Sequence, residues 1–149
     1  MFDQLLLGSA IMLVSLVGGG MMWWVLNEVL LWMEPWLRRP PHPAKLFVVI
    51  LMVVLSTMSM MTFGVWLWAI VFKQMSVFST LEEAVYYSLV AYTTLGLGDL
   101  VVPKEQRLLG GMTAANGFLM FGLMTAMLTD TLRHVRRVQH SLRDKGQKL

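Results

Sequence analysis

The sequence predicts an all-α integral membrane protein with three transmembrane helices and a short re-entrant helix and loop before the third. One observation is composition, because 56% of the 149 residues are hydrophobic and only 14% are charged, which is too apolar for a soluble domain of this size. The other is three runs without an ionisable residue, each longer than the roughly 18–20 residues that cross a hydrocarbon core. These runs are Leu5–Leu26, Leu46–Phe72 and Leu108–Thr129. A fourth apolar stretch, Ala84–Leu97, has the length of a re-entrant segment.

The first helix is expected over residues 1–33. It is not expected to be a cleaved signal peptide, because no Lys or Arg precedes the apolar run and the run is too long. Residues 34–45 follow and contain four prolines. Because proline runs do not continue a helix, a stiff, extended linker is expected there.

The second membrane helix is expected over residues 46–72 and the short re-entrant helix over 79–92. A hydroxyl at Ser79 or Thr80 is followed by Glu82 and Glu83, the spacing of a capping box. The next segment, 93–99, is expected to be loop. The third membrane helix is expected over 107–130, and the tail 131–149 keeps helical spacing of its apolar residues, so the helix should continue past the membrane.

The distribution of basic residues predicts the orientation. Nine Lys or Arg residues lie in the linker and tail, against three between the second and third runs. Positive charge favours the cytoplasmic side, so the N-terminus is expected outside and the C-terminus in the cytoplasm. Anionic lipid at the cytoplasmic face is the expected partner of these charges, and no nucleic acid is needed to explain them. The nine are Arg38, Arg39, Lys45, Arg133, Arg136, Arg137, Arg143, Lys145 and Lys148.

The segment after the re-entrant helix alternates glycine with apolar residues, at Gly96 and Gly98, and ends in Asp99. Because glycine adopts backbone angles that other residues avoid, such a chain can turn successive carbonyls to one side. Rings of carbonyls can replace the water shell of a cation. One chain supplies one ligand per ring, so this interpretation requires an oligomer.

A GLGD sequence in a membrane protein also resembles the motif of intramembrane aspartyl proteases, in which two carboxylates share one site. The candidate partner of Asp99 is Asp130, at the far end of the third run. At 1.5 Å per residue the two lie about a membrane thickness apart. The protease interpretation is therefore rejected, and no enzymatic activity is expected.

This part of the chain resembles the pore loop of potassium channels, which carries an aromatic pair, a serine and TTVGYGD at the same spacing. The matching residues here are Tyr86-Tyr87-Ser88, then Thr93-Thr94-Leu95-Gly96-Leu97-Gly98-Asp99, and then Pro103. TIGLGD-type second pore loops of two-pore-domain potassium channels look closer still. The run from Gly117 to Ala126 is similar to the inner helix of small bacterial proton-gated potassium channels. The resemblance covers about Leu46–Thr129, and the first helix has no counterpart in the two-span members.

The resemblance implies a homotetrameric, potassium-channel-like pore that conducts K⁺ without a cofactor. The membrane it implies is a bacterial inner (plasma) membrane. K⁺ would be bound by the carbonyls of Thr94, Leu95, Gly96 and Leu97, with the Thr94 hydroxyl. Residues implied to support this filter are Thr93, Gly98, Asp99, Tyr86 and Tyr87. Residues implied to form the cavity and gate are Gly117, Phe118, Phe121, Gly122, Thr125, Thr129 and Asp130. Asp130 has two open interpretations, a ring that concentrates cations or a pair with Arg133 or His134.

Three departures from the family pattern bear on filter rigidity and selectivity, and one is that the aromatic pair, Tyr86 and Tyr87, is Tyr rather than Trp. Leu97 replaces the usual Tyr, whose hydroxyl braces the filter, and Val90 and Ala91 stand where the proton-gated relatives carry an acid and a Thr. A weakly selective cation channel therefore stays an alternative within the class. A non-conducting membrane accessory subunit is the alternative from another class. The sequence does not indicate the gating stimulus.

Overall fold

The computed structural model describes residues 2–37 and 42–146. These residues form four α-helices and one short 3-10 turn, and none of them lies in a β-strand. The elements are α1 (Phe2–Leu37), α2 (His42–Gln74), α3 (Leu81–Tyr92), η1 (Lys104–Gln106) and α4 (Arg107–Gly146). The predicted all-α class is confirmed.

Three of the helices are long and apolar enough to cross a membrane, over Phe2–Trp36, Phe47–Gln74 and Lys104–Thr131. Large apolar side chains on these helices face outward, among them Trp32 and Phe47. Contiguous apolar surface of this kind marks a membrane interface. The protein is therefore an integral membrane protein with three spans.

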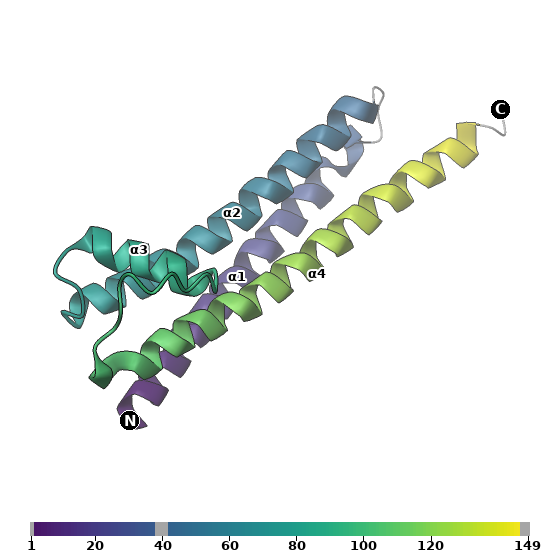
Figure 1. Ribbon diagram of the computed structural model, residues 1–149. Coiled ribbons are helices and arrows are strands. Elements are labelled where there is room, and N and C mark those ends of the chain that lie inside the picture. Colours follow the sequence, from purple (N-terminus) through teal and green to yellow (C-terminus); the bar gives the residue numbers. More distant parts are fainter. Residues whose placement is uncertain (1, 38–41, 147–149) are drawn as a thin grey trace.

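The short helix α3 and the segment after it, residues 93–99, here called the return segment, lie at one end of the bundle (Figure 1). There α3 packs beside the C-terminal end of α2, and the chain then turns back toward the beginning of α4. Helices α1 and α4 begin at this end and run the same way, while α2 runs in the opposite direction. The N- and C-termini consequently lie at opposite ends of the molecule.

The expectation of an extended linker over 34–45 is wrong at both ends of that range, because the described residues there are helical. Helix α1 continues to Leu37 with Pro35 inside its last part, and α2 begins at His42, ahead of the expected start at 46. Proline is tolerated here because Pro43 lies in the first turn of α2, where backbone N–H groups have no partner in the helix. Residues 38–41, with Arg38 and Arg39, lie outside the described residues.

The other helix boundaries differ less from the expectation. Helix α3 begins at Leu81 rather than 79 because Thr80 is its N-cap. Helix α4 begins at Arg107 as expected and continues without a break beyond 130 to Gly146. The expected continuation of the third helix into the tail is confirmed as far as the described residues extend.

Helix α1 packs along both α2 and α4, so it is part of the protomer and not a detached anchor. Glycines allow the helices to approach closely. A Cβ atom at Gly8 would lie 2.4 Å from the sulfur of Met112, and one at Gly18 would lie 2.6 Å from the Phe63 ring.

An aromatic cluster fixes the turn from α2 into α3. The Phe72 ring contacts Phe78 edge-on at 6.0 Å and Tyr87 edge-on at 5.3 Å between centroids. The Tyr87 ring also lies 5.0 Å from Phe78. Because Phe72 is fully buried, this cluster anchors the second half of α3 to the end of α2.

Candidate ion pathway

The start of α3 is fixed by the capping box that the sequence predicts. The backbone N–H of Glu83 donates to Thr80 Oγ1 at 3.1 Å, and the backbone N–H of Thr80 donates to Glu83 Oε2 at 3.2 Å. The Ser79 hydroxyl also donates to Glu83 Oε2, at 2.7 Å. These hydrogen bonds hold the pKa of the Glu83 carboxyl below its usual value, and the bond from the Ser79 hydroxyl has the largest effect.

The other end of α3 turns sharply into the return segment. Thr93 is the C-cap, and its hydroxyl donates to the carbonyl oxygen of Leu89 at 2.8 Å. The N–H of Leu95 donates to the carbonyl oxygen of Val90 at 3.0 Å, and that of Gly96 donates to the same oxygen at 3.3 Å. Leu95 and Gly96 are thus held against the last turn of α3.

The return segment has positive φ at every second residue. The φ angles are +58° at Thr94, +61° at Gly96 and +79° at Gly98, while Leu95 and Leu97 between them do not have positive φ. Alternation of this kind turns successive carbonyls toward one side, and glycine adopts it without strain. For Thr94, a positive φ costs about 1–3 kcal/mol of conformational energy, and strained residues of this kind cluster at functional sites.

This segment is exposed in a single chain. The side chains of Leu95 and Leu97 are 63% and 59% exposed, and neither glycine has an atom within 4 Å of where a Cβ would be. Large apolar side chains exposed to this extent mark a surface of interaction with another molecule or with the membrane.

Asp99 ends the segment and is held by the first turns of α3. The Tyr86 hydroxyl donates to Asp99 Oδ2 at 2.5 Å, and the N–H of Leu100 donates to Asp99 Oδ1 at 3.0 Å. The Tyr86 hydrogen bond is the main reason that the pKa of the Asp99 carboxyl lies below its ordinary value. Tyr86 is the support residue whose contact the structure shows directly.

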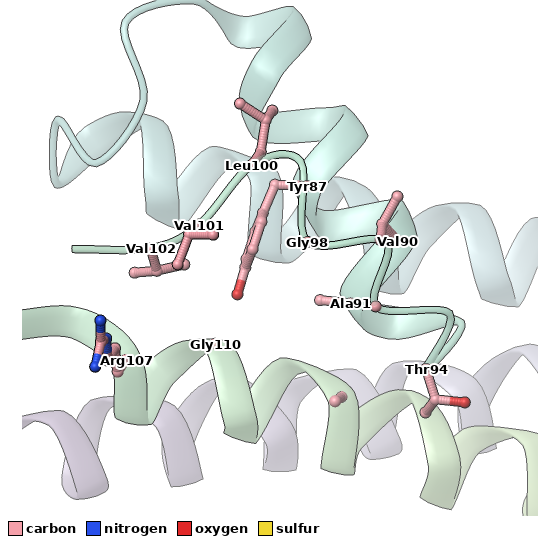
Figure 2. A pocket seen from close by; sticks show the side chains of 12 residues that line it. Tyr87, Val90, Ala91, Thr94, Gly98, Leu100, Val101, Val102, Arg107 and Gly110 are labelled. Carbon is pink, nitrogen blue, oxygen red and sulfur yellow. The ribbon is translucent and has the colours of Figure 1, made fainter. Parts of the chain in front are cut away.

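Tyr87 lies on the other side of α3, beside a pocket between α3, the return segment and α4 (Figure 2). Its hydroxyl approaches α4 at Gly110, where a Cβ would lie 2.3 Å away. Arg107, at the start of α4, also lines this pocket. Tyr87 thus packs α3 against α4, and it makes no contact with Asp99 comparable to that of Tyr86.

Most of the expected cavity residues share one exposed side of α4. Phe118 is 71% exposed. The hydroxyls of Thr125 and Thr129 donate to the carbonyl oxygens of Phe121 and Thr125, both at 2.8 Å. Gly117 is separated from this set, because it is buried and faces α3. The exposed residues are Phe118, Phe121, Gly122, Thr125, Thr129 and Asp130.

Gly117 is a contact point between α4 and α3. A Cβ atom there would lie 1.8 Å from the carbonyl oxygen of Tyr92. Helix α4 is uninterrupted through this position, and Gly117 allows its close approach to α3. The cavity and gate role that the resemblance implies for Gly117 stays a prediction.

Tyr92 was absent from the residues that the sequence singled out. It is the last residue of α3, two positions before Thr94, and it is 1% exposed. An aromatic residue directly before the paired threonines was the signal available in the sequence.

The two acidic residues of the rejected protease interpretation do not meet. Asp99 precedes α4, and Asp130 lies 23 residues after the first residue of α4, Arg107. That length of helix is about 35 Å at 1.5 Å per residue.

Three membrane-length helices, with a short helix and a carbonyl-bearing return segment between the second and third, define a membrane protein of the channel class. The family model described as ion channel matches residues 48–134, more than half of the chain. The chain therefore belongs to the ion channel family. Comparison with curated proteins and with solved structures found no match. The matched residues leave out α1, which is additional to the family's shared part.

Proposed function

We propose that four copies of this chain form a passive cation channel that favours K⁺ and conducts it through a filter made by Thr94, Leu95, Gly96 and Leu97. The observation that carries the proposal is the alternation of φ along the segment. The φ angle is positive at Thr94, Gly96 and Gly98, and it is not positive at Leu95 and Leu97 between them. Such alternation can turn several carbonyls of one chain toward a single axis, which supports a filter at this segment. Four such segments around that axis would complete the coordination of a dehydrated cation.

Two further features support the proposal. The C-terminal, partially negative end of α3 lies directly before the filter segment, where it favours a cation in the adjacent cavity. The exposed side of α4 carries the Thr125 and Thr129 hydroxyls, whose oxygens can still accept hydrogen bonds from ion-bound water.

The proposed orientation places Asp99 and the N-terminus outside and the tail in the cytoplasm. Its basis is the excess of Lys and Arg in the linker and tail. The same charges favour anionic lipid at the cytoplasmic face. A bacterial inner membrane is the proposed location, by resemblance to the small bacterial channels.

The second candidate is a weakly selective cation channel, and it rests on Leu97. A leucine cannot donate the hydrogen bond of the tyrosine usual at this position. The Tyr86–Asp99 hydrogen bond holds the filter at its end, whereas Leu97 is 59% exposed within one chain. Packing of Leu97 against other copies would then decide how rigid the filter is.

The test uses the full chain in liposomes and compares K⁺ with Na⁺ flux. Gly96→Ala should abolish flux while leaving the assembly intact, because alanine is strained at a φ of +61°. Gly20→Ala is the matched control, since Gly20 lies in α1 with no atom within 4 Å of a Cβ, and it should conduct normally. Mass measurement in mild detergent should show a tetramer. A monomer or dimer, or full flux through Gly96→Ala, would contradict the proposal.

A further inference from the structure

Tyr92 is the residue at which all four helices of the protomer meet. Its hydroxyl lies against α2 at Gly64, where a Cβ would be 2.2 Å away, and its carbonyl oxygen lies against α4 at Gly117. The same hydroxyl faces the hydroxyl of Ser15 in α1. The additional helix therefore reaches the end of α3, two residues before Thr94.

Asn116 lies near the level of Ser15, because α1 and α4 run in the same direction with facing residues 101 to 104 positions apart. A Cβ at Gly8, for example, would contact both Leu109 and Met112. The Gln4 side chain donates to the carbonyl oxygen of Glu105, a separation of 101 residues. A Cβ at Gly19 would lie 2.6 Å from Met120, and 120 − 19 is again 101. An offset of 101 from Ser15 is Asn116, which is next in sequence to Gly117, the residue in contact with Tyr92.

These three residues carry four buried polar atoms that need partners. Ser15 Oγ, Tyr92 OH, Asn116 Oδ1 and Asn116 Nδ2 are buried. Within the described part of the chain none makes a hydrogen bond of full distance and angle, although the Ser15 and Tyr92 hydroxyls face each other. The buried Thr113 hydroxyl in α4, by contrast, donates to the carbonyl oxygen of Leu109 at 2.9 Å. An unpartnered polar group is especially costly inside a membrane, where water is scarce.

The donors and acceptors of the three side chains match one another. A tyrosine hydroxyl can donate to an amide oxygen, an amide N–H can donate to a serine hydroxyl, and that hydroxyl can donate back to the tyrosine oxygen. Packing alone would need none of these atoms, because Ala, Phe and Leu would fill the same positions with similar shapes.

We propose that Ser15, Tyr92 and Asn116 form one buried hydrogen-bonded junction, directly or through one shared water molecule, by which α1 holds the end of the pore helix and stabilises the filter. The three are positioning residues, since they act on the filter through α3. The effect on conduction rests on the proposed function, whereas the junction itself does not. This gives the helix outside the matched family region a role in the ion pathway.

The first experiment measures amide hydrogen exchange of the purified full-length protein in detergent. Ser15→Ala and Tyr92→Phe should each speed exchange of the amides of residues 93–96 roughly fivefold, the factor for one ordinary hydrogen bond. The double variant should exchange no faster than the faster single variant, because both changes break the same network. Ser9→Ala is the control, since Ser9 is exposed on the same helix, and it should match the wild type.

Unchanged exchange in both single variants, or effects that simply add in the double variant, would overturn the junction. The second experiment measures K⁺ flux of the same variants in liposomes, where the single variants should lose flux by a similar factor, roughly fivefold. Faster exchange with wild-type flux would overturn the link to the filter. A wild type that conducts no cation would refute the proposed function, and the exchange experiment would still decide the junction.

Discussion

At the scale of single residues, the return segment is held at both ends by α3. Leu95 and Gly96 donate to the carbonyl oxygen of Val90 at one end, and Asp99 accepts from the Tyr86 hydroxyl at the other. The glycines between these two attachments have no side chain to pack. The stability of the segment within one chain therefore depends strongly on the two attachments.

We expect Tyr86→Phe to shift the acid response of Asp99 to higher pH. The Tyr86 hydrogen bond lowers the pKa of Asp99 in the folded protein, so its stabilising effect is present above the unfolded pKa. That effect is lost as the pH falls through the lowered folded value. Without the hydroxyl, the pKa should rise toward the ordinary value. Carboxyl carbon NMR of Asp99 during a pH titration measures this, and an unchanged midpoint would contradict it.

Leu97→Tyr should preserve conduction and raise the preference for K⁺ over Na⁺ if the filter is loose. The added hydroxyl would provide the brace that leucine lacks. Reversal potentials in mixed K⁺ and Na⁺ measure the permeability ratio. An unchanged ratio would show that leucine packing between copies already holds the filter firmly.

At the scale of helices, the contact between α3 and α4 depends on one glycine. The carbonyl oxygen of Tyr92 occupies the space that a side chain at Gly117 would take. Since this oxygen belongs to the backbone at the end of α3, moving it would also displace the adjoining residues 93–99. The close approach of the two helices thus requires glycine at this position.

Gly117→Ala should therefore destabilise the protein by about 1–3 kcal/mol, the usual cost of overpacking. Gly111→Ala is the matched control on α4, because Gly111 is exposed with no atom within 4 Å of a Cβ. It should be neutral or slightly stabilising, as alanine favours helix. Thermal unfolding of the two variants in the same detergent compares them, and equal midpoints would refute the contact.

At the scale of the whole molecule, three parallel or antiparallel spans place the two termini at opposite ends (Figure 1). The beginnings of α1 and α4 share one end with α3 and the return segment. The side on which the basic tail lies therefore determines the side on which the proposed filter opens.

Cysteine labelling tests this orientation cleanly, because the chain has no cysteine of its own. Asp3→Cys and Lys104→Cys should react in intact cells with a thiol reagent that does not cross membranes. Cysteines at positions 41 and 147 should react only after lysis, because basic segments stay in the cytoplasm. Labelling of positions 3 and 147 together in intact cells would contradict the three-span topology.

The sequence by itself determined the features that depend on local pattern. Run length and hydropathy determined the three spans, the spacing from Thr80 to Glu83 determined the start of α3, and Gly96 and Gly98 marked where positive φ occurs. Such features follow from neighbouring residues. Proline content misled at the ends of the linker, because the cost of a proline depends on its place within a helix turn.

Only the tertiary structure decided which distant residues meet. It placed α1 along α4, brought the Tyr86 hydroxyl to Asp99, and put the carbonyl of Tyr92 against Gly117. Each contact depends on helix register and rotation, which packing against other helices determines and which no local pattern encodes.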